Sequence, residues 1–569
     1  MPPAISYLAN RLALAGAAAR PGLAGMALII GLHAAAMALL VATESDTAAK
    51  AAFLLFWGLL NCFWLVVLRR PAAAAGLSLA LLVWLILLSR LKHSALFMTV
   101  NFVDLMIIDS DTFVFLFHVI PNLGWVTALT VLLVIAVLIA IFLVDRVRVR
   151  WRTALLGAAV CLAALTALAY AVPSDPYDEF NRHQYVSKFA RSGSTAVTDY
   201  FRFGLLDSDA TVSERLGAAS DEACKPAQRP PNIIMLLDES SFDLSIASGV
   251  KVPAGYQQHF RSFDGKARSF VVEGAGGPSW FTEYNVLTGL SARSYGRFAD
   301  FVTRISAGHV ERGFPRALRR CGYKTFSFYP FFGAFLSARS FQIKAGIEYF
   351  LDAKDLGTRG VEQDRFFYDA AASVIARERG TAPLFLFVYT TANHFPWTYR
   401  FRPELMPEWH DPGNGSEADE YLRRQALSAR DYGEFVARLK REFPQEAFLL
   451  VRFGDHQPGF ARHLLDPSLD DSFLARRIAE HDPRFLTTYY AIDAVNFRPA
   501  DLSSALDTLD APYLPIVIME AAGLPLDPSF AEQRKILQRC RGLFHRCAGG
   551  AEARRFNRLL IDAGLIKGL

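Results

Sequence analysis

Ser279 lies in a glycine-rich turn, GGPSWFTEY, that precedes a stretch of helical composition. A serine on such a turn exposes its hydroxyl beside the first N–H groups of the helix, and these groups favour an anion. This arrangement suits a nucleophile that attacks a negatively charged substrate. It also suits a helix cap, because Glu283 follows Ser279 at one residue more than the capping-box spacing. The turn alone leaves both roles open.

Acidic and histidine residues follow three separate apolar runs in the second part of the chain. In chain order they are Asp238, Glu239, His394, Asp455 and His456. If the runs are parallel strands, their carboxyl ends meet at one edge of a sheet, where ligands bind in open α/β folds. Carboxylate oxygens and imidazole nitrogens are ligands for a divalent metal ion. We therefore expect a metal site at this edge, with Ser279 completing it and the metal making its hydroxyl nucleophilic.

The apolar runs themselves are typical of buried strands. They cover residues 232–237, 324–329, 384–389 and 448–451. Helical stretches lie between them, for example 421–443. Strands that alternate with helices indicate an α/β domain with a mostly parallel, doubly wound sheet.

The first third of the chain has a different composition. The whole sequence has 569 residues, 52% of them hydrophobic, with a mean hydropathy of +0.22. Five apolar runs are long enough to cross a bilayer: 21–42, 51–68, 71–89, 124–144 and 153–172. The first run is too long for a cleaved signal peptide and four more follow, so we expect it to be retained. These runs predict a five-helix transmembrane domain.

Positive charge lies at alternate ends of the five runs. The arginines concerned are Arg11, Arg20, Arg69, Arg70, Arg146, Arg148, Arg150 and Arg152. The positive-inside rule then places the N-terminus in the cytoplasm and everything after the fifth run outside. We expect a multi-pass protein of a bacterial inner membrane whose second domain faces the periplasm or the outside.

The apolar segment 93–121 carries Asp104, Asp109 and Asp111. Three carboxylates disfavour a sixth span, so we expect an interfacial segment on the outer side. The predicted organisation is a transmembrane domain over 1–172, a juxtamembrane linker over 173–230 and a catalytic domain over 231–569.

Cysteine usage agrees with an exported second domain. Cys540 and Cys547 are close enough in sequence to form a disulfide, and Cys224 with Cys321 is the remaining pairing. Free buried thiols are the alternative. The net charge of +5 is small for this length and no dense Lys/Arg block occurs, so nucleic acid is not an expected partner.

Four motifs together resemble a known family. PNIIMLLDES, GGPSWFTEYNVLTGL, NHFPW and FGDHQP occur in this order. The order resembles the lipoteichoic acid synthase-like branch of the alkaline phosphatase/sulfatase superfamily, which includes phosphoglycerol transferases and has phosphoethanolamine transferases as near relatives. The five-span N-terminus before an exported domain also looks like this group, so the resemblance covers nearly the whole chain.

The resemblance implies a role for each site residue. Glu239, Ser279, Asp455 and His456 would hold one manganese, zinc or magnesium ion, with Ser279 as the nucleophile. His394 would act on the leaving group or orient the acceptor. The remaining candidates for substrate binding are Arg339, Trp280 and Glu283.

The sequence departs from the family pattern at three places. The nucleophile is usually threonine in these synthases. Tyr329 and Pro330 stand near the position of a head-group-binding histidine, and the tryptophan of the family's FW-x-R segment is not evident before Arg339. The head group therefore stays open. No C-x-P-x-R motif occurs, which argues against a true sulfatase.

The expected reaction is transfer of a phospho-alcohol head group, phosphoglycerol or phosphoethanolamine, from a membrane phospholipid. It proceeds through a covalent intermediate on Ser279 to a hydroxyl of a glycan or glycolipid. Two alternatives remain: a phosphodiesterase that uses water at the same site, and a non-catalytic membrane assembly protein. The intact set of site residues argues against the second.

Overall fold

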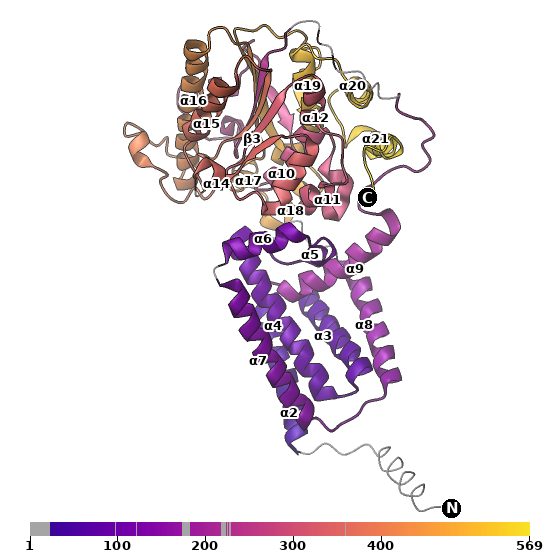
Figure 1. Ribbon diagram of the computed structural model, residues 1–569. Coiled ribbons are helices and arrows are strands. Elements are labelled where there is room, and N and C mark those ends of the chain that lie inside the picture. Colours follow the sequence, from indigo (N-terminus) through magenta and orange to yellow (C-terminus); the bar gives the residue numbers. More distant parts are fainter. Residues whose placement is uncertain are drawn as a thin grey trace, which may run out of the picture. The chain divides into compact units, whose positions relative to one another are not determined.

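The computed structural model describes residues 23–96, 98–120, 122–172, 182–217, 224, 226, 229–358 and 360–569. The chain divides into two compact units, Met1–Arg202 and Phe203–Leu569. Figure 1 shows that the first unit consists of helices and that the second surrounds a sheet with helices.

The N-terminal unit contains five helices that are long and apolar enough to cross a membrane. They are α2 (Leu23–Thr43), α3 (Thr47–Leu68), α4 (Pro71–Leu96), α7 (Leu123–Val144) and α8 (Trp151–Ala171). Each corresponds to one predicted run, so the chain is a multi-pass membrane protein. The α7 span has a mean hydropathy of 3.1 and none of it is buried inside the protein, as expected for a helix that faces lipid.

Two short helices occupy the segment predicted to be interfacial. They are α5 (Phe102–Met106) and α6 (Ser110–Val119). A capping box opens each one, with Asn101 and Asp104 in the first and Asp109 and Thr112 in the second. Asp104 also forms an ion pair with Lys92 at 2.8 Å. These carboxylates therefore end and cap short helices, which is why no sixth spanning helix forms among the described residues.

Part of the predicted linker 173–230 is helical. Helix α9 (Tyr185–Phe203) reaches the boundary between the two units, and its N-terminal part packs inside the first of them. The carboxylate of Glu44 accepts hydrogen bonds from Ser187 Oγ at 2.6 Å and from the Val186 N–H at 3.3 Å. Residues 173–181 and most of 218–228 lie outside the described part of the chain.

One eight-stranded sheet forms the centre of the second unit as described. Its strands are β1 (Asn232–Asp238), β2 (Arg268–Val271), β3 (Lys324–Phe328), β4 (Tyr349–Leu351), β5 (Leu384–Tyr389), β6 (Phe448–Gly454), β7 (Thr487–Val495) and β8 (Thr508–Asp510). The spatial order is β4-β3-β5-β1-β6-β7-β2-β8. Neighbouring strands pair in parallel, except that β7 is antiparallel to both β6 and β2. The mostly parallel α/β sheet is therefore confirmed.

Helices cover both faces of this sheet (Figure 1). On one face, α15 (Asp364–Glu378) and α16 (Ser416–Glu442) pack onto alternate residues of the central strands in one hydrophobic cluster. On the other face, α12 (Phe314–Arg320) places Phe314 edge-on against Phe385 of β5, with ring centroids 5.2 Å apart. Strands buried on both sides explain why the central runs lack polar alternation.

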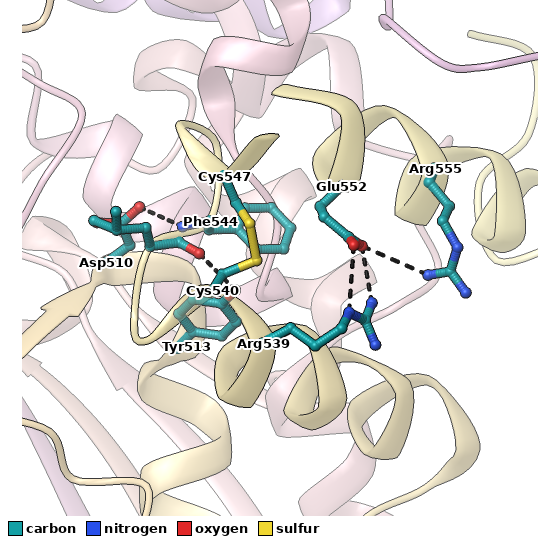
Figure 2. Close-up of a disulfide and its surroundings, with 9 residues drawn as sticks. Asp510, Tyr513, Arg539, Cys540, Phe544, Cys547, Glu552 and Arg555 are labelled. Carbon is teal, nitrogen blue, oxygen red and sulfur yellow. Dashed lines mark hydrogen bonds and ion pairs between the residues drawn. A yellow bond between two sulfur atoms is a disulfide. The ribbon is translucent and has the colours of Figure 1, made fainter. Parts of the chain in front are cut away.

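The second unit contains two disulfides. Cys540, at the end of α20 (Pro528–Cys540), is bonded to Cys547 (Figure 2), and Cys224 is bonded to Cys321. The loop between Cys540 and Cys547 is held to the sheet edge, because the Phe544 N–H donates to Asp510 Oδ2 at 2.6 Å. The thiols of Cys62 and Cys161 lie on the spanning helices α3 and α8 and are free.

Candidate metal centre and active site

The pairing of β1 with β6 brings the metal-site candidates together. These two strands are parallel neighbours, and Asp238, the last residue of β1, is in register with Gly454, the last residue of β6. Glu239 and Asp455 therefore leave the sheet side by side. One ligand atom each from Glu239, Asp455 and His456 lies within 4.8 Å of the other two. All three side chains are buried.

Ser279 joins this cluster from a third element. It is the first residue of α10 (Ser279–Thr288), and its Oγ lies 3.4 Å from His456 Nε2. A hydrogen bond from Thr282 Oγ1 to the Asp455 carbonyl oxygen, at 2.6 Å, ties α10 to the loop after β6. The N-cap position belongs to Pro278, which has no capping side chain. The alternative in which Ser279 is the helix cap is therefore wrong.

The approach to Ser279 depends on a glycine. Gly276 has a φ of +70°, in the left-handed region that favours glycine. A Cβ at this position would lie 3.4 Å from the Cα of Gly459, in the loop after β6. The sharp turn therefore places the start of α10 close to the loop that carries Asp455 and His456.

The hydrogen bonds at the cluster leave one acceptor atom each on Asp455 and His456 without a backbone donor. Asp455 Oδ1 accepts from the N–H groups of Ser240 at 2.7 Å and His456 at 2.9 Å, whereas Asp455 Oδ2 is buried without a hydrogen-bond partner. His456 Nδ1 lies 2.9 Å from the carbonyl oxygen of Gln457. A carbonyl can only accept, so Nδ1 carries the proton and the lone pair of Nε2 faces Ser279, Glu239 and Asp455.

The electrostatics of the cluster favour a cation. Burial raises the pKa of Glu239 well above its usual value, and the negative charge of Asp455 raises it further. Two buried carboxylates this close repel each other unless a positive charge lies between them. Together with the imidazole lone pair and the serine hydroxyl, they fit one divalent metal ion.

Asp238, one residue before Glu239, points away from this cluster, as strand alternation predicts. Its Oδ2 accepts from Tyr489 and lies 2.8 Å from His259 Nε2 in a buried network. Thr390 Oγ1 connects this network to Glu239, because it accepts a hydrogen bond from the Glu239 N–H at 3.2 Å and lies 3.3 Å from Asp238 Oδ1. This network holds the end of β1 and fixes the direction of Glu239.

His394 lies on the turn after β5, with its ring half-buried. Its Nδ1 donates to the carbonyl oxygen of Phe395 at 2.8 Å, and its ring stacks on that of Phe395 at 4.4 Å. Burial is the main reason why the pKa of His394 is lowered to about 4, and the nearby His456 contributes to this lowering. The imidazole is therefore neutral near pH 7, with its Nε2 lone pair available to accept a proton.

A buried ion pair positions the His394 turn and was not predicted from the sequence. Arg424 of α16 donates to the carbonyl oxygens of His394 at 2.7 Å, Pro396 at 3.0 Å and Tyr399 at 3.0 Å. Its Nε lies 2.6 Å from Glu420 Oε1. An arginine and a glutamate four residues apart on an amphipathic helix look like a surface pair, so the sequence held no signal for this role.

The other three substrate-binding candidates do not join the cluster through any described contact. Arg339 forms ion pairs with Asp352 at 2.8 Å and Asp355 at 3.1 Å. The indole N–H of Trp280 donates to the carbonyl oxygen of Asp300 at 2.9 Å.

Glu283 is buried on α10 and accepts a hydrogen bond from Gln342 at 2.8 Å; burial raises the pKa of Glu283 to about 7. Its carboxyl group is thus part of the packing between α10 and α13 (Ala338–Ala345). A role of Glu283 in substrate binding stays a prediction.

Comparisons with known proteins agree with this site. Residues 277–478 match the sulfatase family model, which spans the turn of Ser279, the turn of His394 and the Asp455-His456 pair. The chain therefore contains a sulfatase-type domain, in agreement with the sulfatase part of the predicted resemblance. An uncharacterized protein of Haemophilus influenzae is 24% identical over 268 residues, which are 43% of this chain and about half, 47%, of that protein.

Solved structures with a similar fold include two transferases. The phosphoglycerol transferase GacH of Streptococcus pyogenes is 16% identical, with a TM-score of 0.44 over 60% of this chain and 87% of its own. The lipooligosaccharide phosphoethanolamine transferase EptA of Neisseria meningitidis, an integral membrane protein, is 13% identical, with a TM-score of 0.37 over 73% of this chain and 83% of its own.

Proposed function

We propose that this protein is a metal-dependent membrane transferase. It moves a phosphoglycerol or phosphoethanolamine head group from a phospholipid, through Ser279, to a hydroxyl of a glycan or glycolipid. One observation carries the proposal: Ser279 Oγ lies 3.4 Å from His456 Nε2, beside two buried carboxylates. The five apolar helices of the same chain would anchor this site to a membrane, which contains the lipid substrate.

Four residues would hold the metal: Glu239, Ser279, Asp455 and His456. A bound manganese, zinc or magnesium ion would lower the pKa of the serine hydroxyl and offset charge on the phosphoryl oxygens. In the first step Ser279 Oγ attacks phosphorus, the bond from phosphorus to the diacylglycerol oxygen breaks, and diacylglycerol leaves with a proton. In the second step the acceptor hydroxyl attacks the phosphodiester on Ser279, and the serine hydroxyl is restored.

The surrounding residues assist both steps. Ser279 is the first residue of α10, so a phosphoryl group on its Oγ lies at the positive end of the helix dipole. The neutral imidazole of His394 suits orientation of the acceptor hydroxyl through a hydrogen bond, rather than protonation of the leaving group. The sequence left both roles of His394 open, and its low pKa favours the second step.

The proposed location is the bacterial inner membrane, with the sulfatase-type domain in the periplasm or outside. Disulfides persist in oxidising compartments, so the Cys540–Cys547 and Cys224–Cys321 bonds support this side of the membrane. The arginines after the second and fourth spans support the same orientation.

The mass added to Ser279 tests the proposal. Full-length protein is incubated with vesicles of phosphatidylglycerol or phosphatidylethanolamine, and the peptide that contains Ser279 is analysed by mass spectrometry. A phosphoglycerol or phosphoethanolamine adduct identifies the donor. The Ser279→Ala variant is the control and should carry no adduct. Head-group transfer without any adduct on Ser279 would contradict the covalent route.

A further inference from the structure

A cavity lined by both charged and apolar residues lies in the sulfatase-type domain, away from the candidate metal centre. It has a volume of about 230 Å³ and lies between α12 and the start of α20. Its lining includes Arg312, Arg316, Arg320, Asp527, Ala563 and Leu565. Helix α10 separates it from the metal centre: Arg312 binds the carbonyl oxygen of Thr288, the last residue of α10, whereas Ser279 is the first. A ten-residue helix is about 15 Å long.

Arg316 and Arg320 lie four residues apart on α12 and therefore share one side of that helix, and Arg312 precedes it. Arg312 is buried and fully committed, because it donates to Ser529 Oγ at 3.0 Å and to Gln533 Oε1 at 2.6 Å. Arg316 and Arg320 differ: neither has a carboxylate partner within the described ranges. Arg316 donates one bond to the Lys344 carbonyl oxygen, and its Nε is buried without a hydrogen-bond partner.

The acidic residues of the cavity form no ion pair with these two arginines among the residues that the structure describes, although the pKa of Glu311 is lowered by its hydrogen bond from Lys567 and also by the charge of Arg316. Glu311 forms an ion pair with Lys567 at 2.8 Å. Asp527 caps α20, where its Oδ1 accepts from the N–H groups of Ser529 at 2.8 Å and Phe530 at 3.0 Å. The cavity therefore keeps a surplus of positive charge and an unused buried donor, and an unused buried donor is unfavourable unless a ligand satisfies it.

We propose that this cavity binds a small phosphorylated compound. Arg316 and Arg320 hold the phosphate oxygens, because guanidinium groups match that geometry with two parallel N–H donors. The cavity is larger than a bare phosphate, and the apolar side chains of Ala563 and Leu565 give room for a short carbon skeleton. The proposal is independent of the function proposed above, since none of these residues belongs to the metal centre.

Binding to full-length protein in detergent tests the proposal. Inorganic phosphate and glycerol phosphate are titrated calorimetrically into wild type, R316Q/R320Q and R319Q. Arg319 is the matched control, because it lies on the same helix but pairs with Glu348 at 3.2 Å. Each lost guanidinium should weaken binding about tenfold, so the double variant should bind about a hundredfold more weakly. R319Q should bind like wild type.

The phosphate could come from a free metabolite or from a lipid head group, and a second arm separates the sources. Wild type and R316Q/R320Q are placed in nanodiscs with and without phosphatidylglycerol, and retained lipid is counted by native mass spectrometry. If R316Q/R320Q loses affinity for phosphate or glycerol phosphate in the calorimetric titration, the ligand is a free compound. If R316Q/R320Q only retains less lipid than wild type, the ligand is a lipid head group. Because Arg320 is exposed, R320Q should fold normally and still bind about tenfold more weakly. Equal binding by wild type and all variants in both arms would overturn the proposal.

Discussion

The two units of this chain place their polar groups by different means. In the N-terminal unit, carboxylates such as Asp104 and Asp109 cap short helices, each through neighbours three residues away. In the sulfatase-type domain, Glu239, Ser279 and Asp455 come from three elements that are distant in sequence. Local rules therefore account for these capping carboxylates of the first unit, whereas the chemistry of the second depends on strand pairing.

The largest expected effect concerns membrane orientation. A reporter that is active only outside the cytoplasm, fused after Leu569, should be active, because five spans with arginines after the second and fourth place the C-terminus outside. The same reporter fused after Arg69 should be inactive, since the proposed orientation places that loop in the cytoplasm. Activity after Arg69 and inactivity after Leu569 would show that the orientation predicted from the arginines is wrong.

Ser279 should have the largest effect on turnover. Ser279→Ala should lower head-group transfer at least about a thousandfold, because the reacting oxygen is lost. Ser279→Thr should keep measurable activity, since it keeps a hydroxyl. Transfer assays at equal metal content check both variants. Near-normal transfer by the alanine variant would place the chemistry elsewhere.

Asp455 should control metal content. Asp455→Asn keeps a carbonyl oxygen for the Ser240 and His456 N–H groups but removes the charge, so the fold should survive and most bound metal should be lost. Elemental analysis of purified protein measures the effect. Asp369→Asn is the control, because Asp369 is exposed and forms only surface ion pairs, with Arg438 and Arg365. Equal metal content in wild type and Asp455→Asn would refute the ligand assignment.

The smallest expected effect concerns the cysteines. Unfolding without reductant should expose only Cys62 and Cys161 to thiol labelling, because the other four are bonded. Replacing Cys540 and Cys547 by serine should cost about 2–3 kcal/mol, and replacing Cys224 and Cys321 about 4–5 kcal/mol, since the longer loop gains more freedom on unfolding. Denaturant titration, followed by a spectroscopic signal of the sulfatase-type domain, compares the free energies of unfolding of the two double variants with that of wild type. Labelling of Cys540 in the unreduced wild type would show that the Cys540–Cys547 disulfide does not form.

Some strands escaped prediction from the sequence for clear physical reasons. β4 and β8 have three residues each, which is too short for a hydrophobic period. β2 has four residues and one buried arginine, Arg268, whose charge is met by Asp264 and Ser262. β7 pairs antiparallel with the preceding strand, β6, and with β2, a strand far away in the sequence, and residue spacing does not encode the second pairing.

The five spans, the central strands and the set of metal-site candidates could all be predicted from the residues alone, because apolar length and strand-end chemistry are local properties. The tertiary structure decided which candidates meet. Glu239 and Asp455 converge because β1 and β6 are neighbours in register, and Ser279 joins them because Gly276 allows a close approach. Arg339 and Glu283, equally plausible by residue type, instead satisfy Asp352 and Gln342. Long-range pairing sets these partners, and no residue spacing encodes it.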